Sequence, residues 1–428
     1  MKPYLFALIL GLFAILGAPL FAVILAVAML GFYYSGIDLS VIAVDIYRLS
    51  DTSVLLSLPL FTFAGYLLGE SNASQRLVRL TQVFIGWIPG GFAIVAFIAC
   101  AMFTAFTGAS GVTIVALGAL LYPALTQAGY GEKFSLGLVT SSGSLGLLFP
   151  PSLPLILYGI IVQQMNIGKA VAIVDLFIAG LLPGLLMLVM LSAWSFWTNR
   201  KTPIPLTEFS FKSTQTAIRE AIWEIPLPVF VLGGIYGGFF AVSEVAAVTA
   251  LYVLVTEVLI YREIHPKKLL PIIRESMMVS GGILLILGVS MASTSFLIDA
   301  EVPMRLFKMI QAHVTEKVVF LILLNLLLLL LGAILDIFSA LVLMVPLILP
   351  VALNYGIHPV HMGIIFLANM QIGYFTPPVG MNLFIASYRF KKPVVELYRA
   401  TIPFMVVLLV ALLLITYLPG LSLVFLKK

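Results

Sequence analysis

Charged residues are scarce in this 428-residue chain: only 10% of its residues are Asp, Glu, Lys or Arg, whereas 62% are hydrophobic. A soluble fold of this size needs polar side chains to cover its surface, and this composition does not supply them. Neither Leu80–Gly131 nor Phe134–Gly168 contains a charged residue or a histidine. Since one membrane span takes about 20 apolar residues, such runs indicate stacked membrane segments.

Cysteine and the usual sequence marks of catalysis are also missing. Cys100 is the only cysteine and lies in an apolar run, which excludes an intrachain disulfide and a cysteine-based metal site. No Gly-rich phosphate loop, HExxH motif or GxSxG motif stands at a plausible position, and no nucleophile is paired with a base. We predict that the chain is not an enzyme, holds no cofactor and binds no ATP of its own.

The few basic residues are concentrated in three hydrophilic stretches, which we interpret as loops: Asn199–Glu224, Arg262–Glu275 and Arg389–Arg399. The positive-inside rule places these loops in the cytoplasm, and it places Asn354–His361, which has no Lys or Arg, in the periplasm. We therefore predict a multi-pass protein of the bacterial inner (cytoplasmic) membrane, with about 11 to 13 crossings or hairpins. The net charge of +5 does not indicate a nucleic-acid partner, because it is spread over short loops.

Two stretches of the chain match each other at an offset of 227 residues: GLLFPP over Gly146–Pro151 and GYFTPP over Gly373–Pro378. Proline removes a backbone donor and frees carbonyl groups, and glycine permits close approach, so each stretch predicts a broken helix. Within a membrane, freed carbonyls persist only where they are buried in protein or serve as ligands. Paired interruptions are typical of transporters with internal repeats and predict where substrate and coupling ion bind.

A small polar island precedes each break. The first is Thr104–Thr113, which is rich in hydroxyls and small residues, and the second is Asp336–Ser339. We predict that Thr107–Gly111 and Asp336–Ser339 are the tips of two re-entrant hairpins. Asp336 is the only charged residue between Val318 and Tyr388. A carboxylate within a membrane is costly, so it indicates a cation ligand, a proton relay or the cap of a helix end.

With both repeats in view, the chain resembles the large membrane subunit of a TRAP (tripartite ATP-independent periplasmic) transporter over essentially its whole length. The resemblance rests on three motifs and their spacing: Thr107–Gly111, Gly146–Ser152 and Gly373–Gly380. It implies an all-α polytopic membrane protein with inverted repeats, two re-entrant helical hairpins and two broken transmembrane helices, as in elevator-type ion transporters.

The same resemblance implies a function and partners. It implies sodium-coupled import of a small organic acid, such as sialic acid or a C4-dicarboxylate, by a transport domain that moves against a scaffold in the lipid bilayer. A periplasmic binding protein delivers the organic-anion substrate, and a small four-helix membrane subunit packs on the scaffold. Sodium ions are the only metal expected.

The resemblance also divides the chain into two transport repeats, each a hairpin plus a broken helix, and three scaffold regions. The repeats are residues 80–165 and 277–388. The scaffold regions are the N-terminal helices 1–79, ending in a polar loop Glu70–Arg79, the central helices and cytoplasmic loops 166–276, and the C-terminal helix 389–428.

Carried over position by position, the resemblance gives two sodium sites and a polar substrate lining. The first sodium site would use Gly108, Ser110, Gly146 and Phe149. The second would use Asp336, Ser339, Gly373, Thr376 and Gly380. The substrate lining would consist of Ser141, Ser142, Ser144, Ser152, Asn369, Gln371 and Asn382.

One alternative within transport stays open. A self-sufficient ion-coupled organic-anion or cation/proton antiporter could use Asp336 as its proton site. His358 and His361 lie in a predicted loop, and we interpret them as surface residues rather than ligands.

Overall fold

The computed structural model describes residues 11–13, 16–49, 52–88, 90–165, 167, 171–200 and 210–426, and within these ranges the protein is helical without a β-strand. Nine helices in this part of the chain are long and apolar enough to cross a membrane, and three shorter apolar helices accompany them. This confirms the prediction of an all-α polytopic membrane protein.

The two halves repeat the same order of elements. In the first half, a hairpin of α6 (Gly91–Thr107) and α7 (Ser110–Gln127) is followed by a broken helix, α8 (Glu132–Ser142), η3 (Leu145–Leu148) and α9 (Leu153–Met165). In the second half, the hairpin is α16 (Lys317–Ile334) and α17 (Ile337–Asn354), and the broken helix is α18 (Pro359–Gly373) and α19 (Met381–Phe390). Helices α7 and α17 start 227 residues apart, as do α8 and α18, so the sequence offset is also a structural one.

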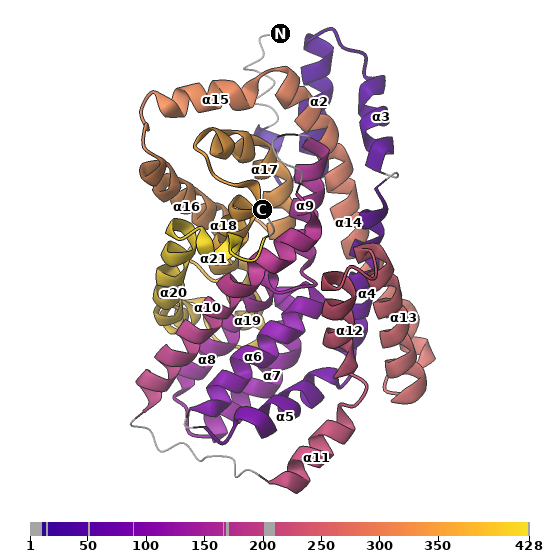
Figure 1. Cartoon of the computed structure of the whole chain (residues 1–428), viewed down its shortest axis with the longest axis vertical. Helices are drawn as coiled ribbons and strands as arrows, with labels where there is room; N and C mark the ends of the chain where they lie inside the picture. Colours follow the sequence, from indigo (N-terminus) through magenta and orange to yellow (C-terminus); the bar gives the residue numbers. More distant parts are fainter. Residues whose placement is uncertain are drawn as a thin grey trace.

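The two repeats point in opposite directions. In Figure 1, α6, α7 and α8 lie in the lower half of the molecule and α9 in the upper half, whereas α16, α17 and α18 lie in the upper half and α19 in the lower half. The contacts follow the same symmetry, because α7 packs on α19 and α17 packs on α9. The repeats are therefore inverted, and the predicted tips lie between α6 and α7 and between α16 and α17.

The remaining helices surround this core. They are α2 (Leu20–Tyr34), α3 (Ser40–Arg48), η2 (Ser53–Leu56), α4 (Ser57–Glu70), α5 (Ala73–Ile85), α10 (Ile173–Asn199), α11 (Phe211–Glu220), α12 (Pro226–Tyr236), α13 (Val242–Leu254), the π-helical turn η4 (Val255–Ile260), α14 (Pro266–Asp299), α15 (Val302–Gln311), α20 (Val394–Tyr417) and α21 (Gly420–Leu423).

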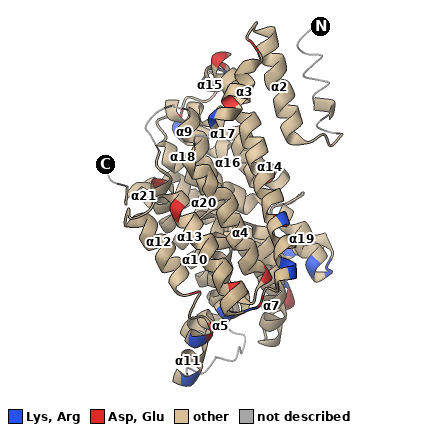
Figure 2. Cartoon of the chain, turned by 90° about the vertical axis from the view of Figure 1, so that its right-hand side faces the viewer, with Lys and Arg blue, Asp and Glu red and all other residues tan. Residues whose placement is uncertain are grey.

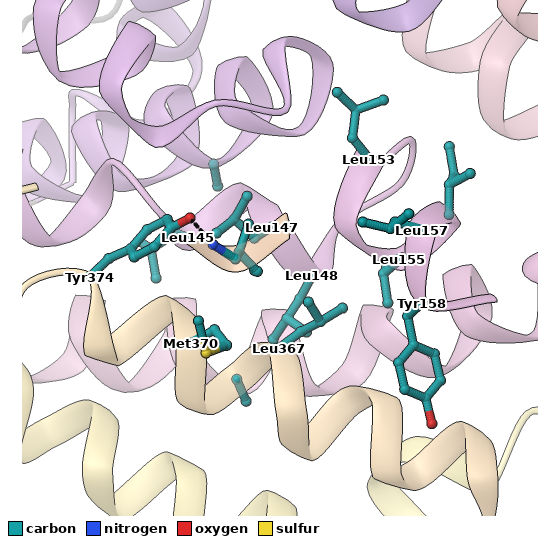
Figure 3. Packing of buried hydrophobic residues seen from close by; sticks show 14 of the residues in the cluster. Leu145, Leu147, Leu148, Leu153, Leu155, Leu157, Tyr158, Leu367, Met370 and Tyr374 are labelled. Atoms are coloured by element: carbon teal, nitrogen blue, oxygen red, sulfur yellow. Dashed lines mark hydrogen bonds between the residues drawn. The ribbon is translucent and has the colours of Figure 1, made fainter. Parts of the chain in front are cut away.

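The centre of the hydrophobic core is the place where the two broken helices meet. Leu145, Leu147 and Leu148 of η3 are buried, and Leu148 lies beside Leu367 of α18 in Figure 3. Apolar side chains thus fill the space around both breaks, which keeps lipid away from the interrupted backbone.

The structure corrects several predictions about loops. Glu70–Arg79 is not a loop, because α5 begins at Ala73 and buries Arg76, Leu77 and Val78. The stretches Arg262–Glu275 and Arg389–Arg399 consist largely of the first turns of α14 and α20. Hydropathy marks where lipid ends, but a helix continues into water beyond that point. As a result, the predicted boundaries at 79/80 and 276/277 fall inside continuous helices.

His361 is also corrected, since it is buried rather than on the surface. Its Nδ1 lies 3.2 Å from the hydroxyl of Ser422, and its Nε2 lies 3.3 Å from the carbonyl oxygen of Thr416. His358 caps α18 by accepting a hydrogen bond from the N–H of Val360. The histidine pair therefore anchors the start of α18 and the end of the chain.

Lys and Arg gather around α5, α11 and α19 in Figure 2, at the end of the molecule opposite α2, α3 and α15. The positive-inside rule assigns this basic end to the cytoplasm. The predicted topology thus places α3 and α15 at the periplasmic end.

This topology predicts the labelling of single cysteines in a Cys100→Ala background. Met309→Cys on α15, where the native side chain is 61% exposed, should react with a membrane-impermeant maleimide added to intact cells. Lys212→Cys on α11 should react only after the membrane is permeabilised. Labelling of both cysteines from the outside would contradict the assignment.

Candidate functional site

The backbone of the first broken helix contacts the backbone of the first hairpin at Gly146. A Cβ atom on Gly146 would stand 2.3 Å from the carbonyl oxygen of Ala101 and 2.5 Å from the backbone nitrogen of Ala105. No side chain larger than hydrogen fits there, so glycine brings η3 against the backbone of α6.

Hydroxyl groups tie the same hairpin to the break. Thr104 Oγ1 lies 2.9 Å from the carbonyl oxygen of Gly143 and 2.7 Å from Thr113 Oγ1. At the hairpin tip, Gly108 adopts a positive φ of 66°, and a Cβ there would collide with Leu153 at the start of α9. Ser110 follows at the N-terminus of α7. A Cβ atom added to Gly143 would stand 3.3 Å from the carbonyl oxygen of Ser110, so these two residues also lie close together.

Three of the four residues predicted for the first sodium site thus lie where the tip meets the break. The fourth, Phe149, donates its backbone N–H to the carbonyl oxygen of Gly146 at 3.0 Å. The structure therefore places all four predicted residues around one junction of interrupted backbone. Thr104 and Thr113, which hold this junction, were part of the polar island but not of the predicted site.

The second break repeats this contact with a second glycine. A Cβ atom on Gly373 would stand 2.6 Å from both Cα and the carbonyl carbon of Gly332 in α16. The 227-residue offset relates Gly373 to Gly146 and Gly332 to Ala105, so the two junctions are equivalent. Each break is held by glycine against the backbone of the hairpin of its own repeat.

Two further hydrogen bonds join the second hairpin to its break. The N–H of Gly380 donates to the carbonyl oxygen of Ala333 at 2.8 Å, and the N–H of Ile337 donates to the Tyr374 hydroxyl at 2.8 Å. The carbonyl oxygens of Thr376 and Tyr374 lie 2.8 and 3.1 Å from where a Cβ on Gly380 would stand. Backbone oxygens therefore converge beside the hairpin tip.

Asp336 is the N-cap of α17. One of its oxygens accepts hydrogen bonds from the N–H groups of Phe338 and Ser339, each at 3.0 Å, and the other accepts from the Ser339 hydroxyl. The structure thus supports the helix-cap interpretation of this carboxylate. The cap still places the only charge of the second repeat core at the tip, a few residues along the chain from Gly332 and Ala333, which contact Gly373 and Gly380.

The two breaks meet at equivalent positions. The hydroxyl of Ser144 donates to the carbonyl oxygen of Gln371 at 2.9 Å, and these residues are 227 positions apart. A residue and its counterpart touch only near the axis that relates the repeats. Ser144 and Gln371 of the predicted substrate lining therefore lie near the pseudo-twofold axis.

All seven residues of the predicted lining are buried, each at most 1% exposed. Five side-chain oxygens around the tips and breaks have no hydrogen-bond partner among the described residues: Thr107 Oγ1, Ser142 Oγ, Asn369 Oδ1, Gln371 Oε1 and Asn382 Oδ1. A buried polar atom without a partner is costly, so these oxygens point to a ligand that satisfies them. The other lining hydroxyls of Ser141 and Ser152 bond to the carbonyl oxygens of Gly137 and Leu147.

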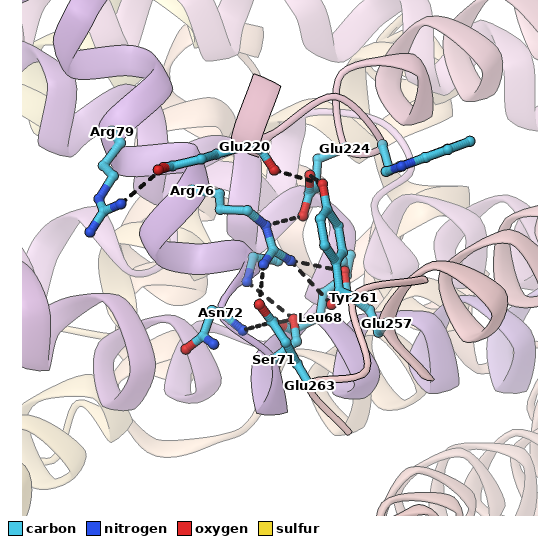
Figure 4. Close-up of polar contacts among 12 residues, drawn as sticks. Leu68, Ser71, Asn72, Arg76, Arg79, Glu220, Glu224, Glu257, Tyr261 and Glu263 are labelled. Carbon is cyan, nitrogen blue, oxygen red and sulfur yellow. Dashed lines mark hydrogen bonds and ion pairs between the residues drawn. The ribbon is translucent and has the colours of Figure 1, made fainter. Parts of the chain in front are cut away.

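A charged cluster that the sequence did not reveal lies at the basic end of the molecule (Figure 4). Arg76 of α5 pairs with Glu224, Glu257 and Glu263, and its guanidinium stacks 3.9 Å from the ring centroid of Tyr261. Burial raises the pKa of Glu224 above its ordinary value, and the charge of Arg76 opposes this shift. The cluster ties α5, which leads into the first hairpin, to the chain around α11, α12 and α14.

The glycine junctions predict a sharp response to one added methyl group. Gly146→Ala and Gly373→Ala should each destabilise the protein by about 1–3 kcal/mol, because the new Cβ collides with backbone that cannot rotate away. Gly282→Ala on α14 is the matched control, since a Cβ there meets nothing within 4 Å. Thermal unfolding of the purified protein checks this, and an equal effect in all three variants would contradict it.

The arginine cluster predicts a larger loss. Arg76→Met should destabilise the protein by about 3–5 kcal/mol, because three carboxylates lose the charge that they share. Arg79→Met is the control, since Arg79 is 61% exposed in its pair with Glu220 and should contribute less than about 1 kcal/mol. Equal unfolding midpoints for the two variants would show that the cluster does not support the fold.

Comparisons with known proteins agree with this architecture. A family model described as "Tripartite ATP-independent periplasmic transporter, DctM component" matches residues 5–421. The isethionate TRAP transporter permease protein DctMQ of Oleidesulfovibrio alaskensis is 32% identical over 97% of this chain, which spans 65% of that relative's length. The C4-dicarboxylate TRAP transporter large permease protein DctM of Pseudomonas aeruginosa is 32% identical over 89% of this chain and 88% of its own length.

A solved structure shares the fold. The crystal structure of the Alcanivorax borkumensis YdaH transporter, described as having an unusual topology, matches with a TM-score of 0.61 over 88% of this chain and 89% of that chain, at 14% identity. The relatives are permease subunits of transporters and not enzymes. This chain is a multi-pass membrane protein that belongs to the DctM component family of tripartite ATP-independent periplasmic transporters.

Proposed function

We propose that this protein is the large permease subunit of a sodium-coupled importer of a small organic acid in the bacterial inner membrane. One observation carries the proposal: each broken helix is held by a glycine against the hairpin of its own repeat, and unpartnered oxygens are buried around both junctions. Such a site offers oxygen ligands inside the membrane, where only a bound ion or substrate can use them.

Sodium suits these junctions because it is a hard cation that prefers oxygen ligands, which are abundant at both tips. The first ion would be held by Gly108, Ser110, Gly146 and Phe149. The second would be held by Gly373, Thr376 and Gly380 together with Asp336 and Ser339. At the second junction, the carbonyl oxygens of Thr376 and Tyr374 both lie beside Gly380, which favours coordination through backbone oxygens.

The substrate would bind between the two ions, against the amides and hydroxyls near the pseudo-twofold axis. Helix N-termini at α9 and α19 supply partial positive charge for a carboxylate or sulfonate. The relatives named for C4-dicarboxylates and isethionate support an organic anion as substrate. Sialic acid belongs to the same chemical class, since it also carries a carboxylate.

A moving domain would let the buried lining reach both sides of the membrane. The hairpins and broken helices contact one another in a symmetric block, and the other helices surround it. Movement of this block as an elevator would carry the site across without opening the glycine junctions. A periplasmic binding protein would deliver the substrate to the end that carries α3 and α15, and a small four-helix membrane subunit would pack on the surrounding helices.

The role of Asp336 gives the experiment that tests this function. Asp336→Asn keeps an oxygen that can cap α17 but removes the charge, so it should weaken sodium binding by about 1–3 kcal/mol while the protein stays folded. The measurement is substrate uptake against sodium concentration in liposomes that contain the chain and its two partners, normalised to protein. Asp336→Ala should be worse, because it removes the cap as well.

Asp38→Asn is the matched control, because Asp38 also accepts a backbone N–H at the start of a helix, that of Ser40 at 2.8 Å, but it lies far along the chain from both breaks. Its half-saturating sodium concentration should equal that of the wild type. An unaltered sodium half-saturation in both Asp336 variants would remove Asp336 from the site. Uptake by this chain alone, driven by a proton gradient without sodium, would support the antiporter instead.

A further inference from the structure

A polar cavity outside both junctions lies between α3, α9 and α14. Its volume is about 390 Å³, and its polar lining comes from Asp45 and Arg48 of α3, Gln164 of α9, and Ser290, Thr294 and Ser295 of α14. In Figure 1, α3 lies at the upper end of the molecule, which the positive-inside rule assigns to the periplasm. A cavity of this size holds a small molecule of the size of an organic acid.

Asp45 is the unusual residue of this cavity. Its side chain is only 6% exposed, yet Oδ2 has no hydrogen-bond partner within the part of the chain that the structure describes. The other oxygen, Oδ1, lies 3.5 Å from Nη1 of Arg48, which is too long for a strong hydrogen bond. Because a carboxylate oxygen accepts hydrogen bonds, Oδ2 of Asp45 needs a donor that none of the described residues supplies.

Arg48 supplies the opposite half of a recognition site. Its side chain is 67% exposed and, apart from the long contact with Asp45, leaves guanidinium donors that can reach an anion. Arginine presents a planar fork that matches a carboxylate or sulfonate. The cavity therefore combines a donor fork for an anion with an acceptor for a hydroxyl or amino group.

We propose that the cavity between α3, α9 and α14 binds a small organic anion that also carries a hydroxyl or amino group, with Arg48 on the acidic group and Asp45 on the donor. This inference rests on the proposed function, because it makes the cavity a first binding site for the organic acid on the periplasmic side. It adds selection for substrates with a hydrogen-bond donor before they reach the buried lining at the breaks.

The walls of the cavity explain how the anion would leave it. Helix α9 belongs to the first repeat, whereas α3 and α14 belong to the surrounding helices. Near the cavity, Gln164 of α9 donates a hydrogen bond to Thr52 Oγ1 at 2.9 Å, so the two parts are in contact here. Movement of the repeats against the surrounding helices would pull this wall away and release the anion.

Thermal unfolding of the purified chain tests the site with two pairs of anions that differ by one hydroxyl group: malate with succinate, and isethionate with ethanesulfonate. At equal ionic strength, a hydroxyl-bearing anion should raise the unfolding temperature more than its partner does. Arg48→Gln should raise the half-maximal anion concentration about tenfold or more, through loss of a charged hydrogen bond. Asp45→Asn should reduce the preference within each pair.

Two controls separate loss of anion binding from loss of folding and from a general effect of charge. Arg48 is mostly exposed and Asp45→Asn keeps the side-chain shape, so both variants should fold, as their unfolding without anion will show. Arg305→Gln removes an exposed charge from α15 at the same end and should leave the anion response unchanged. Absence of any anion response in the wild type, or a full response in Arg48→Gln, overturns the proposal.

A third outcome separates this proposal from the proposed function. If the response is lost in Asn382→Ala but kept in Arg48→Gln, the anion binds at the breaks and not in this cavity. The cavity proposal then fails, while sodium-coupled uptake by the wild type still supports the transporter. If uptake fails with every organic anion but the response depends on Arg48, the anion site stands without the transport function.

Discussion

Two pieces of interrupted backbone can exist inside this membrane protein only because a second backbone covers each of them. At Gly146 and at Gly373 the distance to the neighbouring hairpin is so short that a single added carbon would collide with it. This contact excludes lipid, positions the hairpin tips and leaves carbonyl oxygens in a place that water does not reach. The buried lining and the crossing of the two broken helices both follow from it.

The two junctions share a backbone arrangement but differ in chemistry. The first is fixed by hydroxyl groups, with Thr104 beside Gly143 and Thr113. The second is fixed by Tyr374 and carries the capping carboxylate of Asp336. Inverted repeats therefore place one neutral and one charged junction around a common axis, so that two ions bound there would experience different fields.

The breaks could be predicted because proline and glycine act locally on the backbone, and the short polar segments marked the tips, whereas the inverted order of the repeats came from the family resemblance. Arg76 could not be predicted in the same way, since its three partners lie 148 to 187 residues away and only the fold brings them together. The burial of His361 could not be predicted for the same reason, because its partners Ser422 and Thr416 lie 61 and 55 residues further along the chain. Hydropathy located the membrane but not the ends of α5 and α14, which extend beyond it.

The bond between Ser144 and Gln371 joins a side chain to a main-chain carbonyl, although the two residues are counterparts in the repeats. Every residue carries a carbonyl, but only a donor side chain can fill the other position. The demand that this contact makes on the two side chains is thus one-sided: position 144 must keep a short donor, whereas the contact requires no particular side chain at position 371. The side chain of Gln371 instead reaches Met187 and keeps Oε1 for a ligand, so binding at the axis and cohesion of the two halves depend on different groups of the same residue.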